Sequence, residues 1–154
     1  MTAIINPVTI FLPMLVVVAL TFVAFVRMAV ARGAAVKAGQ DPAYYRAHIG
    51  SPEPEATRAA VRHYGNLLEL PTLLYAACLT AFALGEVSQA MLVFAWGFAI
   101  ARTVQSAIHL TTNTPGHRGL AFVAGVVCLL LLWIDVGWVI FSMLGSGLQA
   151  GGHA

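Results

Sequence analysis

The chain has 154 residues, of which 60% are hydrophobic and only 9% are charged, and its formal net charge is +2. Soluble domains carry about 25% charged residues, so this composition excludes an ordinary soluble fold and favours an integral membrane protein. Because the net charge is small and the basic residues are scattered along the chain, we expect no nucleic-acid partner.

Four apolar segments, each close to the ~20 residues that cross a bilayer, predict transmembrane helices. None alternates apolar and polar residues as barrel strands do, so the predicted fold class is all-α, an integral membrane four-helix bundle forming one domain over residues 1–154. The first segment has no basic residue before Arg27 and no small-residue cleavage site, which argues against a cleaved signal peptide. In chain order, the predicted helices cover about residues 8–30, 57–84, 90–111 and 118–144.

The longest polar connection lies between the first two predicted helices, over about residues 31–60. Pro52 and Pro54 break any helix there, and Glu55 or Thr57 can begin the next one. We therefore expect the second helix to begin before the membrane and to be kinked at Pro71.

The distribution of the basic residues predicts the orientation. The N-terminus, the connection at residues 85–89 and the C-terminal tail contain no Lys or Arg, so all eight cations belong to one side. The positive-inside rule assigns that side to the cytoplasm, which places both termini outside.

Two of the predicted helices carry polar residues at helical spacing. Arg62, Asn66 and Glu69 follow an i, i+4, i+7 pattern and would share one helix face. A second stripe precedes Arg118, which is predicted to start the fourth helix. Ionisable groups at membrane depth are costly and usually face a bundle interior or a cavity. The members of the second stripe are Arg102, Gln105, Ser106, His109 and Asn113.

These stripes have two interpretations. In the first, Arg102 pairs with Glu69, while Asn66 and His109 hydrogen-bond between helices and hold the bundle together. In the second, the surplus of cations over carboxylates near the cytoplasmic ends favours a small anionic ligand with peptide-like carboxylates. Cys78 and Cys128 lie in apolar runs without a CxxC partner, so we expect neither a metal site nor a catalytic thiol.

Two motifs, in this order and spacing, resemble the MAPEG family, the membrane-associated proteins in eicosanoid and glutathione metabolism. The first is R-x-x-x-N-x-x-E-x-P, from Arg62 to Pro71, and the second is R-x-x-x-S-x-x-H-x-x-x-N-x-x-x-x-R, from Arg102 to Arg118. The resemblance covers roughly residues 52–133. It implies a bacterial-type member of the family that forms a homotrimer in the inner (plasma) membrane. In this homotrimer, glutathione lies between neighbouring protomers near the cytoplasmic side. It also implies a lipophilic second substrate that arrives from the bilayer.

Carried over by position, the family pattern makes Arg118 the group that stabilises the thiolate of glutathione, the co-substrate. A nearby cation lowers the pKa of a thiol, so no protein nucleophile is needed. The resemblance implies that the residues framing the glutathione site are Arg62, Asn66, Glu69, Arg102 and His109.

The chain departs from the family pattern at Gly65, Gln105, His109 and Gly119. Two functions therefore stay open: a glutathione-dependent transferase or peroxidase that acts on lipophilic electrophiles, and a non-catalytic lipid-binding or scaffold protein of the same fold. A small-solute channel is disfavoured, because no segment carries the matched polar groups that a pore needs.

Overall fold

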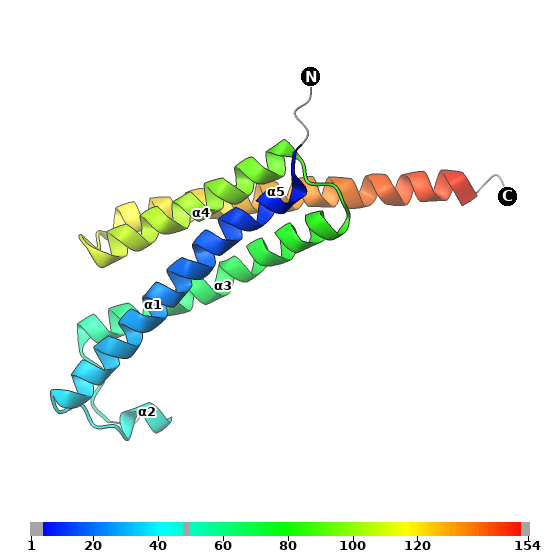
Figure 1. Ribbon diagram of the computed structural model, residues 1–154. Coiled ribbons are helices and arrows are strands. Elements are labelled where there is room, and N and C mark those ends of the chain that lie inside the picture. Colours follow the sequence, from blue (N-terminus) through cyan, green and yellow to red (C-terminus); the bar gives the residue numbers. More distant parts are fainter. Residues whose placement is uncertain (1–4, 48–49, 152–154) are drawn as a thin grey trace. The chain divides into compact units, whose positions relative to one another are not determined.

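The computed structural model describes residues 5–47 and 50–151, with the backbone alone described for residue 47 and residues 147–151. Over these residues the chain forms helices and no strand, which confirms the all-α fold class (Figure 1). The predicted sidedness of the termini falls on residues 1–4 and 152–154, outside the described residues. The elements in order are η1 (Pro7–Ile10), α1 (Phe11–Lys37), α2 (Tyr44–Ala47), α3 (Glu55–Ala83), α4 (Gln89–Leu110) and α5 (Pro115–Gly151).

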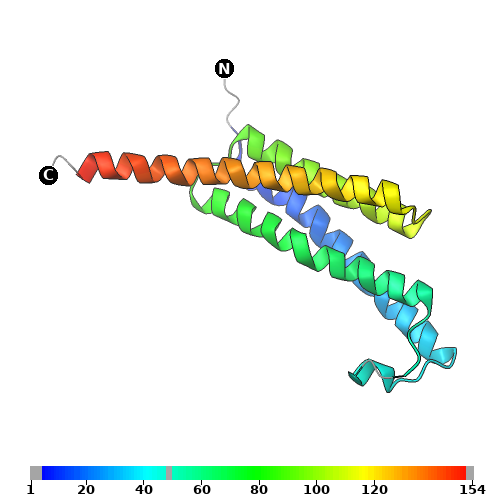
Figure 2. The same ribbon diagram turned by 180° about the vertical axis from the view of Figure 1, so that it is seen from behind.

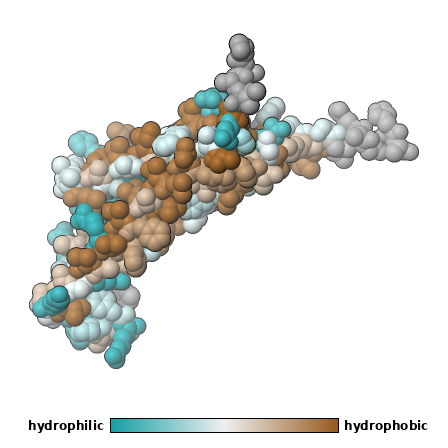
Figure 3. Space-filling view, in the orientation of Figure 1, coloured by the Kyte–Doolittle hydropathy of each residue, from teal (hydrophilic) through white to brown (hydrophobic). Residues whose placement is uncertain are grey.

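In the described part of the chain, four helical spans are long and apolar enough to cross a membrane: Pro7–Lys37, Glu55–Ala83, Gln89–Leu110 and Pro115–Ser146. Large apolar side chains point outward from them, and Figure 3 shows these side chains as brown surface over the helices. Phe22, for example, is 66% exposed and Trp138 is 75% exposed. Such surfaces are stable in lipid, where each helix satisfies its own backbone groups, so the chain is an integral membrane protein.

The first and last helices extend furthest beyond their predicted limits. The first continues to Lys37, because the residues after Val30 are compatible with a helix until Gly39 adopts a φ of +104°. The last begins at Pro115, because proline suits the first position of a helix, where its missing N–H needs no partner. Arg118 is therefore the fourth residue of α5, still within the first turn, rather than its start.

The chain divides into two compact units, which we describe separately: Met1–Val17 with Pro71–Ala154, and Val18–Leu70. In the first unit, α4 packs along α5 and against η1 (Figures 1 and 2). The indole nitrogen of Trp133 in α5 donates to the carbonyl of Leu73 in α3, 3.2 Å away, and the rings of Phe11 and Phe82 are 4.8 Å apart.

One polar contact joins the N-terminal end of α4 to α5. Ser88 caps α4 by accepting a hydrogen bond from the backbone N–H of Met91 (3.0 Å), and its hydroxyl donates to Asp135 Oδ2 (2.7 Å). Asp135 is an acidic residue within a membrane span, and its carboxylate lies at the positive end of the α4 dipole. Within the membrane span, the carboxylate of Asp135 is therefore held by a hydrogen-bond donor from the α4 cap.

Small residues allow α4 and α5 to approach closely. A Cβ placed on Gly97 would lie 2.7 Å from the sulfur of Cys128, and one on Gly125 would lie 3.4 Å from the Cβ of Ala101. Close backbone approach through small residues is a common source of packing energy between membrane helices.

We expect Gly97→Ala to lower the thermal stability of the protein, because the added methyl group would crowd the sulfur of Cys128. Overpacking of this kind lowers the free energy of unfolding by about 1–3 kcal/mol. Thermal unfolding in detergent measures the effect. Adding Cys128→Ala in the same chain removes the sulfur and is expected to restore most of the loss. A Gly97→Ala protein as stable as the wild type would contradict this account of the helix contact.

Candidate functional site

The first polar stripe keeps its predicted arrangement. Because α3 runs without a break through Pro71, Arg62, Asn66 and Glu69 lie along one face of a single helix, and we call them the α3 stripe. Arg62 and Glu69 are exposed, and Asn66 is half-buried. The stripe belongs to the unit of residues 18–70.

The α3 stripe faces away from α1 within this unit. Two contacts show which side of α3 meets α1: Thr57 donates its hydroxyl to the carbonyl of Ala31 (3.5 Å), and the ring of Tyr64 lies 5.7 Å from that of Phe25. At about 100° per residue, the stripe lies on the opposite side of α3 from Thr57 and Tyr64. Within its own unit, the stripe is therefore left uncovered by α1.

The second group of site residues centres on Arg118. Its Nη1 donates to Asn113 Oδ1 at 2.7 Å and contacts His109 Nδ1 at 2.9 Å. We call these three residues the Arg118 cluster. A guanidinium group only donates, so this contact requires that His109 Nδ1 accepts and carries no proton. Both acceptors are neutral, and the positive charge of Arg118 is therefore oriented without being neutralised by them.

The turn between α4 and α5 supplies one of these acceptors. Asn113 adopts a left-handed backbone with a φ of +48°, and its N–H donates to the carbonyl of Ile108 at 2.8 Å, closing the end of α4. Asparagine tolerates this conformation better than other residues with a side chain. The turn thus folds Asn113 back toward the first turn of α5, where Arg118 lies.

Arg102 lies deeper in α4 and has partners of its own. It is only 1% exposed, and its Nη1 donates to Gln105 Oε1 at 2.7 Å. The guanidinium carbon is 5.2 Å from the ring centre of Phe98 and 5.0 Å from that of Phe122 in α5. Stacking between aromatic faces stabilises a desolvated cation, and here it also fixes the packing of α4 against α5.

The predicted site residues fall in both units. Arg62, Asn66 and Glu69 belong to residues 18–70, and Arg102, His109 and Arg118 belong to residues 71–154. His109 and Arg118 are in contact, whereas Arg102, about two turns away on α4, donates to Gln105 instead. The convergence of the two groups in one pocket and the alternative pairing of Arg102 with Glu69 both stay predictions.

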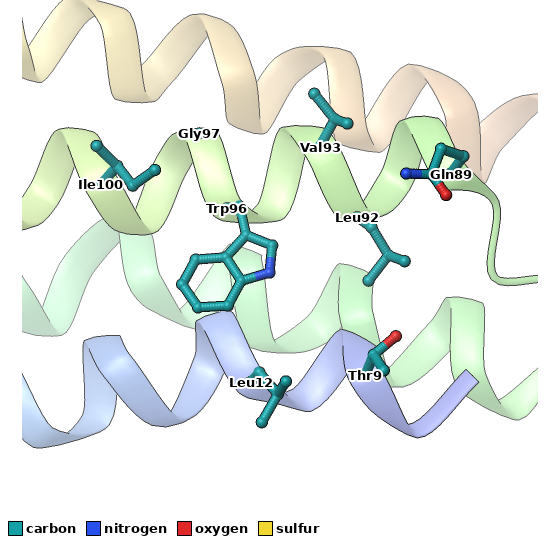
Figure 4. Close-up of a pocket in the computed structure, with 8 residues that line it drawn as sticks. All are labelled: Thr9, Leu12, Gln89, Leu92, Val93, Trp96, Gly97 and Ile100. Carbon is teal, nitrogen blue, oxygen red and sulfur yellow. The ribbon is translucent and has the colours of Figure 1, made fainter. Parts of the chain in front are cut away.

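An open apolar groove of about 670 Å³ lies between η1, the first turn of α1 and α4 (Figure 4). Thr9 and Gln89 give one end of it polar side chains, and Trp96 lies across its middle. His109 is nine positions beyond Ile100, which lies at the other end, so it is about 14 Å further along the helix. The groove therefore stops short of the Arg118 cluster. Its lining residues are Thr9, Leu12, Gln89, Leu92, Val93, Trp96, Gly97 and Ile100.

Sequence reasoning missed one ion pair, between Arg32 and Glu53, whose Nε and Oε1 atoms are 3.1 Å apart. The partners are 21 residues apart in the chain, so no helical spacing reveals them. The prolines on either side of Glu53 are the one local signal that this carboxylate is held in a restricted backbone.

The chain was compared with known proteins. The model of the MAPEG family matches residues 10–138, a range that runs from the end of η1 into α5 and includes every predicted site residue. Neither the curated proteins nor the solved structures gave a significant match.

Proposed function

Because the chain belongs to the MAPEG family, as its two motifs predicted, we propose that it is a membrane glutathione transferase or peroxidase that acts on lipophilic electrophiles. In the transfer reaction, the thiol of glutathione releases its proton to solvent, and the thiolate sulfur attacks the electrophile. A carbon–sulfur bond forms while a leaving group departs with its electron pair, or while the adduct takes up a proton. The protein's part is to bind glutathione and to stabilise the thiolate.

The observation that carries this proposal is the environment of Arg118. Its guanidinium is held by two neutral acceptors, Asn113 and His109, so its charge is available to an anion. It also lies in the first turn of α5, where the helix dipole is positive. A cation and a helix N-terminus both lower the pKa of a thiol and so enlarge the nucleophilic fraction at neutral pH.

The α3 stripe supports a site for the rest of glutathione. Arg62 offers a forked donor for a carboxylate, Asn66 offers both a donor and an acceptor, and Glu69 offers an acceptor. The stripe lies on the side of α3 that faces away from α1. We further propose the family's homotrimer, with glutathione held between protomers at the cytoplasmic side of the inner membrane and both termini outside.

Two departures from the family pattern retain a role. Gln105 accepts from Arg102 at 2.7 Å, and His109 contacts Arg118 at 2.9 Å. Each substitution therefore still provides an acceptor for an arginine, which favours a maintained site over a decayed one. The groove along α4, apolar over most of its length, suits a lipophilic second substrate.

The direct test is glutathione conjugation by the purified protein in detergent with a generic lipophilic electrophile, alongside the thermal stability of the protein with and without glutathione. We expect turnover and a glutathione-dependent rise in Tm. Absence of both would leave the alternative, a non-catalytic lipid-binding or scaffold protein of the same fold.

A prediction for Asn113 separates the role of its side chain from that of its backbone. Asn113→Gly removes the acceptor of Arg118 but adopts a φ of +48° freely, so we expect stability close to that of the wild type and a kcat lower by about tenfold. Steady-state kinetics and thermal unfolding measure the two effects. Thr112→Gly, in the same turn, serves as the control and is expected to leave kcat unchanged. An unchanged kcat in Asn113→Gly would show that Asn113 does not orient Arg118.

A further inference from the structure

A second polar cluster lies in the unit of residues 18–70, and the proposed chemistry does not use it. Arg32 of α1 donates from Nε to Glu53 Oε1 at 3.1 Å, and its guanidinium lies 5.3 Å from the centre of the Tyr45 ring. Glu53 is only 5% exposed. A buried carboxylate is costly unless it is paired, and Arg32 supplies the pair.

The third member of the cluster is the phenol of Tyr45. Its oxygen is buried, and this burial, followed by the adjacent Glu53 carboxylate, raises the pKa of Tyr45 above its ordinary value. The phenol is therefore neutral at physiological pH and adds no charge to the ion pair. The ring of Tyr44 meets that of Tyr45 edge to face, 5.6 Å away, and fills the side of the cluster.

The cluster joins three segments of the chain. Arg32 comes from the last turns of α1, Tyr45 from α2, and Glu53 lies two residues before α3 begins. The connection is also closed by a hydrogen bond from Gln40 Nε2 to the carbonyl of Ser51 (2.9 Å). The segment that leads into α3 is thereby tied to α1 and α2 over a long sequence distance.

We propose that Arg32, Tyr45 and Glu53 form a clasp that fixes the rotation of α3 about its axis, which makes Arg32 and Glu53 positioning residues for the α3 stripe. Because the helix is rigid, a rotation set where the chain enters α3 changes the direction of every side chain further along it. The first stripe residue, Arg62, lies about two turns into α3, so the clasp acts on the stripe from a distance and contacts no substrate. This inference rests on the proposed function for the identity of the ligand that the stripe receives.

The variants that test the clasp change charge and keep shape. Glu53→Gln removes the carboxylate charge, Arg32→Gln removes the cation, and Arg32→Lys keeps the charge while losing the guanidinium. Glu55→Gln is the matched control, because Glu55 is an exposed acid two residues further on. Thermal unfolding of each full-length protein shows first that it is folded.

The kinetic readout is the KM for glutathione compared with kcat. We expect Glu53→Gln and Arg32→Gln to raise the KM for glutathione on the order of tenfold with little change in kcat, because Arg118 and its partners belong to the other unit. Arg32→Lys is expected to recover part of the loss, and Glu55→Gln to behave as the wild type. An unchanged KM in folded Glu53→Gln and Arg32→Gln would overturn the positioning role.

A readout without ligand separates this inference from the proposed function. Backbone hydrogen exchange over residues 55–62 is expected to be faster in Glu53→Gln and Arg32→Gln than in the wild type or Glu55→Gln. Equal exchange rates in all four proteins would overturn the clasp. If the wild type binds no glutathione and exchange still responds to Glu53→Gln, the proposed function fails and the clasp stands as a device of the fold alone.

Discussion

Arg118→Ala is expected to lower the kcat/KM of glutathione conjugation by about 10²- to 10³-fold, the effect of removing an electrostatic group aimed at a reacting anion. The same variant is expected to stay folded, because Arg118 is half-buried and the residues that it contacts, His109 and Asn113, lie at the end of α4 and in the adjoining turn. Kinetics and thermal unfolding of one preparation measure both quantities.

Two control variants test whether the loss of activity is specific to the guanidinium of Arg118. Arg118→Lys keeps a positive charge but loses the planar fork that reaches both acceptors, so we expect activity between those of the wild type and Arg118→Ala. Arg46→Ala removes an exposed cation of α2 and is expected to leave kcat/KM unchanged. If Arg118→Ala retains wild-type turnover, the proposed thiolate stabilisation at this residue is wrong.

Arg102→Ala is expected to affect stability more than any other single replacement in the proposed site, by about 3 kcal/mol or more. The change removes a charged hydrogen bond to Gln105 and the stacking with Phe98 and Phe122, and it leaves a cavity in the α4–α5 contact. Thermal unfolding in detergent measures the loss, with Arg118→Ala as the matched arginine control. Equal stabilities of the two variants would contradict the assigned burial of Arg102.

One further variant distinguishes a purely structural role of Arg102 from a role in binding glutathione. Arg102→Met refills the space with a flexible apolar side chain, so we expect it to recover much of the stability lost in Arg102→Ala. If Arg102 also binds a carboxylate of glutathione, the KM for glutathione rises by about tenfold in this stable variant. A stable Arg102→Met with an unchanged KM would leave Arg102 with a structural role only.

The parts of the fold that depend on local sequence patterns, such as apolar length and residue spacing, were predictable from the sequence. Apolar length indicated the four membrane spans, and two motifs with fixed spacing indicated the family, which the match over residues 10–138 confirms. Helix ends were less predictable, because the backbone conformation of a single residue can decide where a helix begins or ends. Pro115 begins α5 although its neighbourhood resembles a turn, and α1 continues until Gly39 adopts a left-handed conformation.

Contacts between distant residues were beyond local reasoning. Helical spacing placed Arg62, Asn66 and Glu69 on one face, but it does not show which partners a side chain meets on another element. The bond between Ser88 and Asp135 and the pair of Arg32 with Glu53 depend on how helices pack. The sequence thus predicted candidate site residues by their chemical type, while the contacts that orient those residues came from the structure.

The central claim, that Arg118 stabilises the thiolate of bound glutathione, is tested most directly by ultraviolet difference absorbance. Glutathione is titrated into the wild type and into Arg118→Ala at neutral pH, and the thiolate band is recorded in the absence of any electrophile. The account predicts a saturable thiolate band in the wild type that is lost in Arg118→Ala. A wild type without the band, or a band of equal size in both proteins, would contradict it.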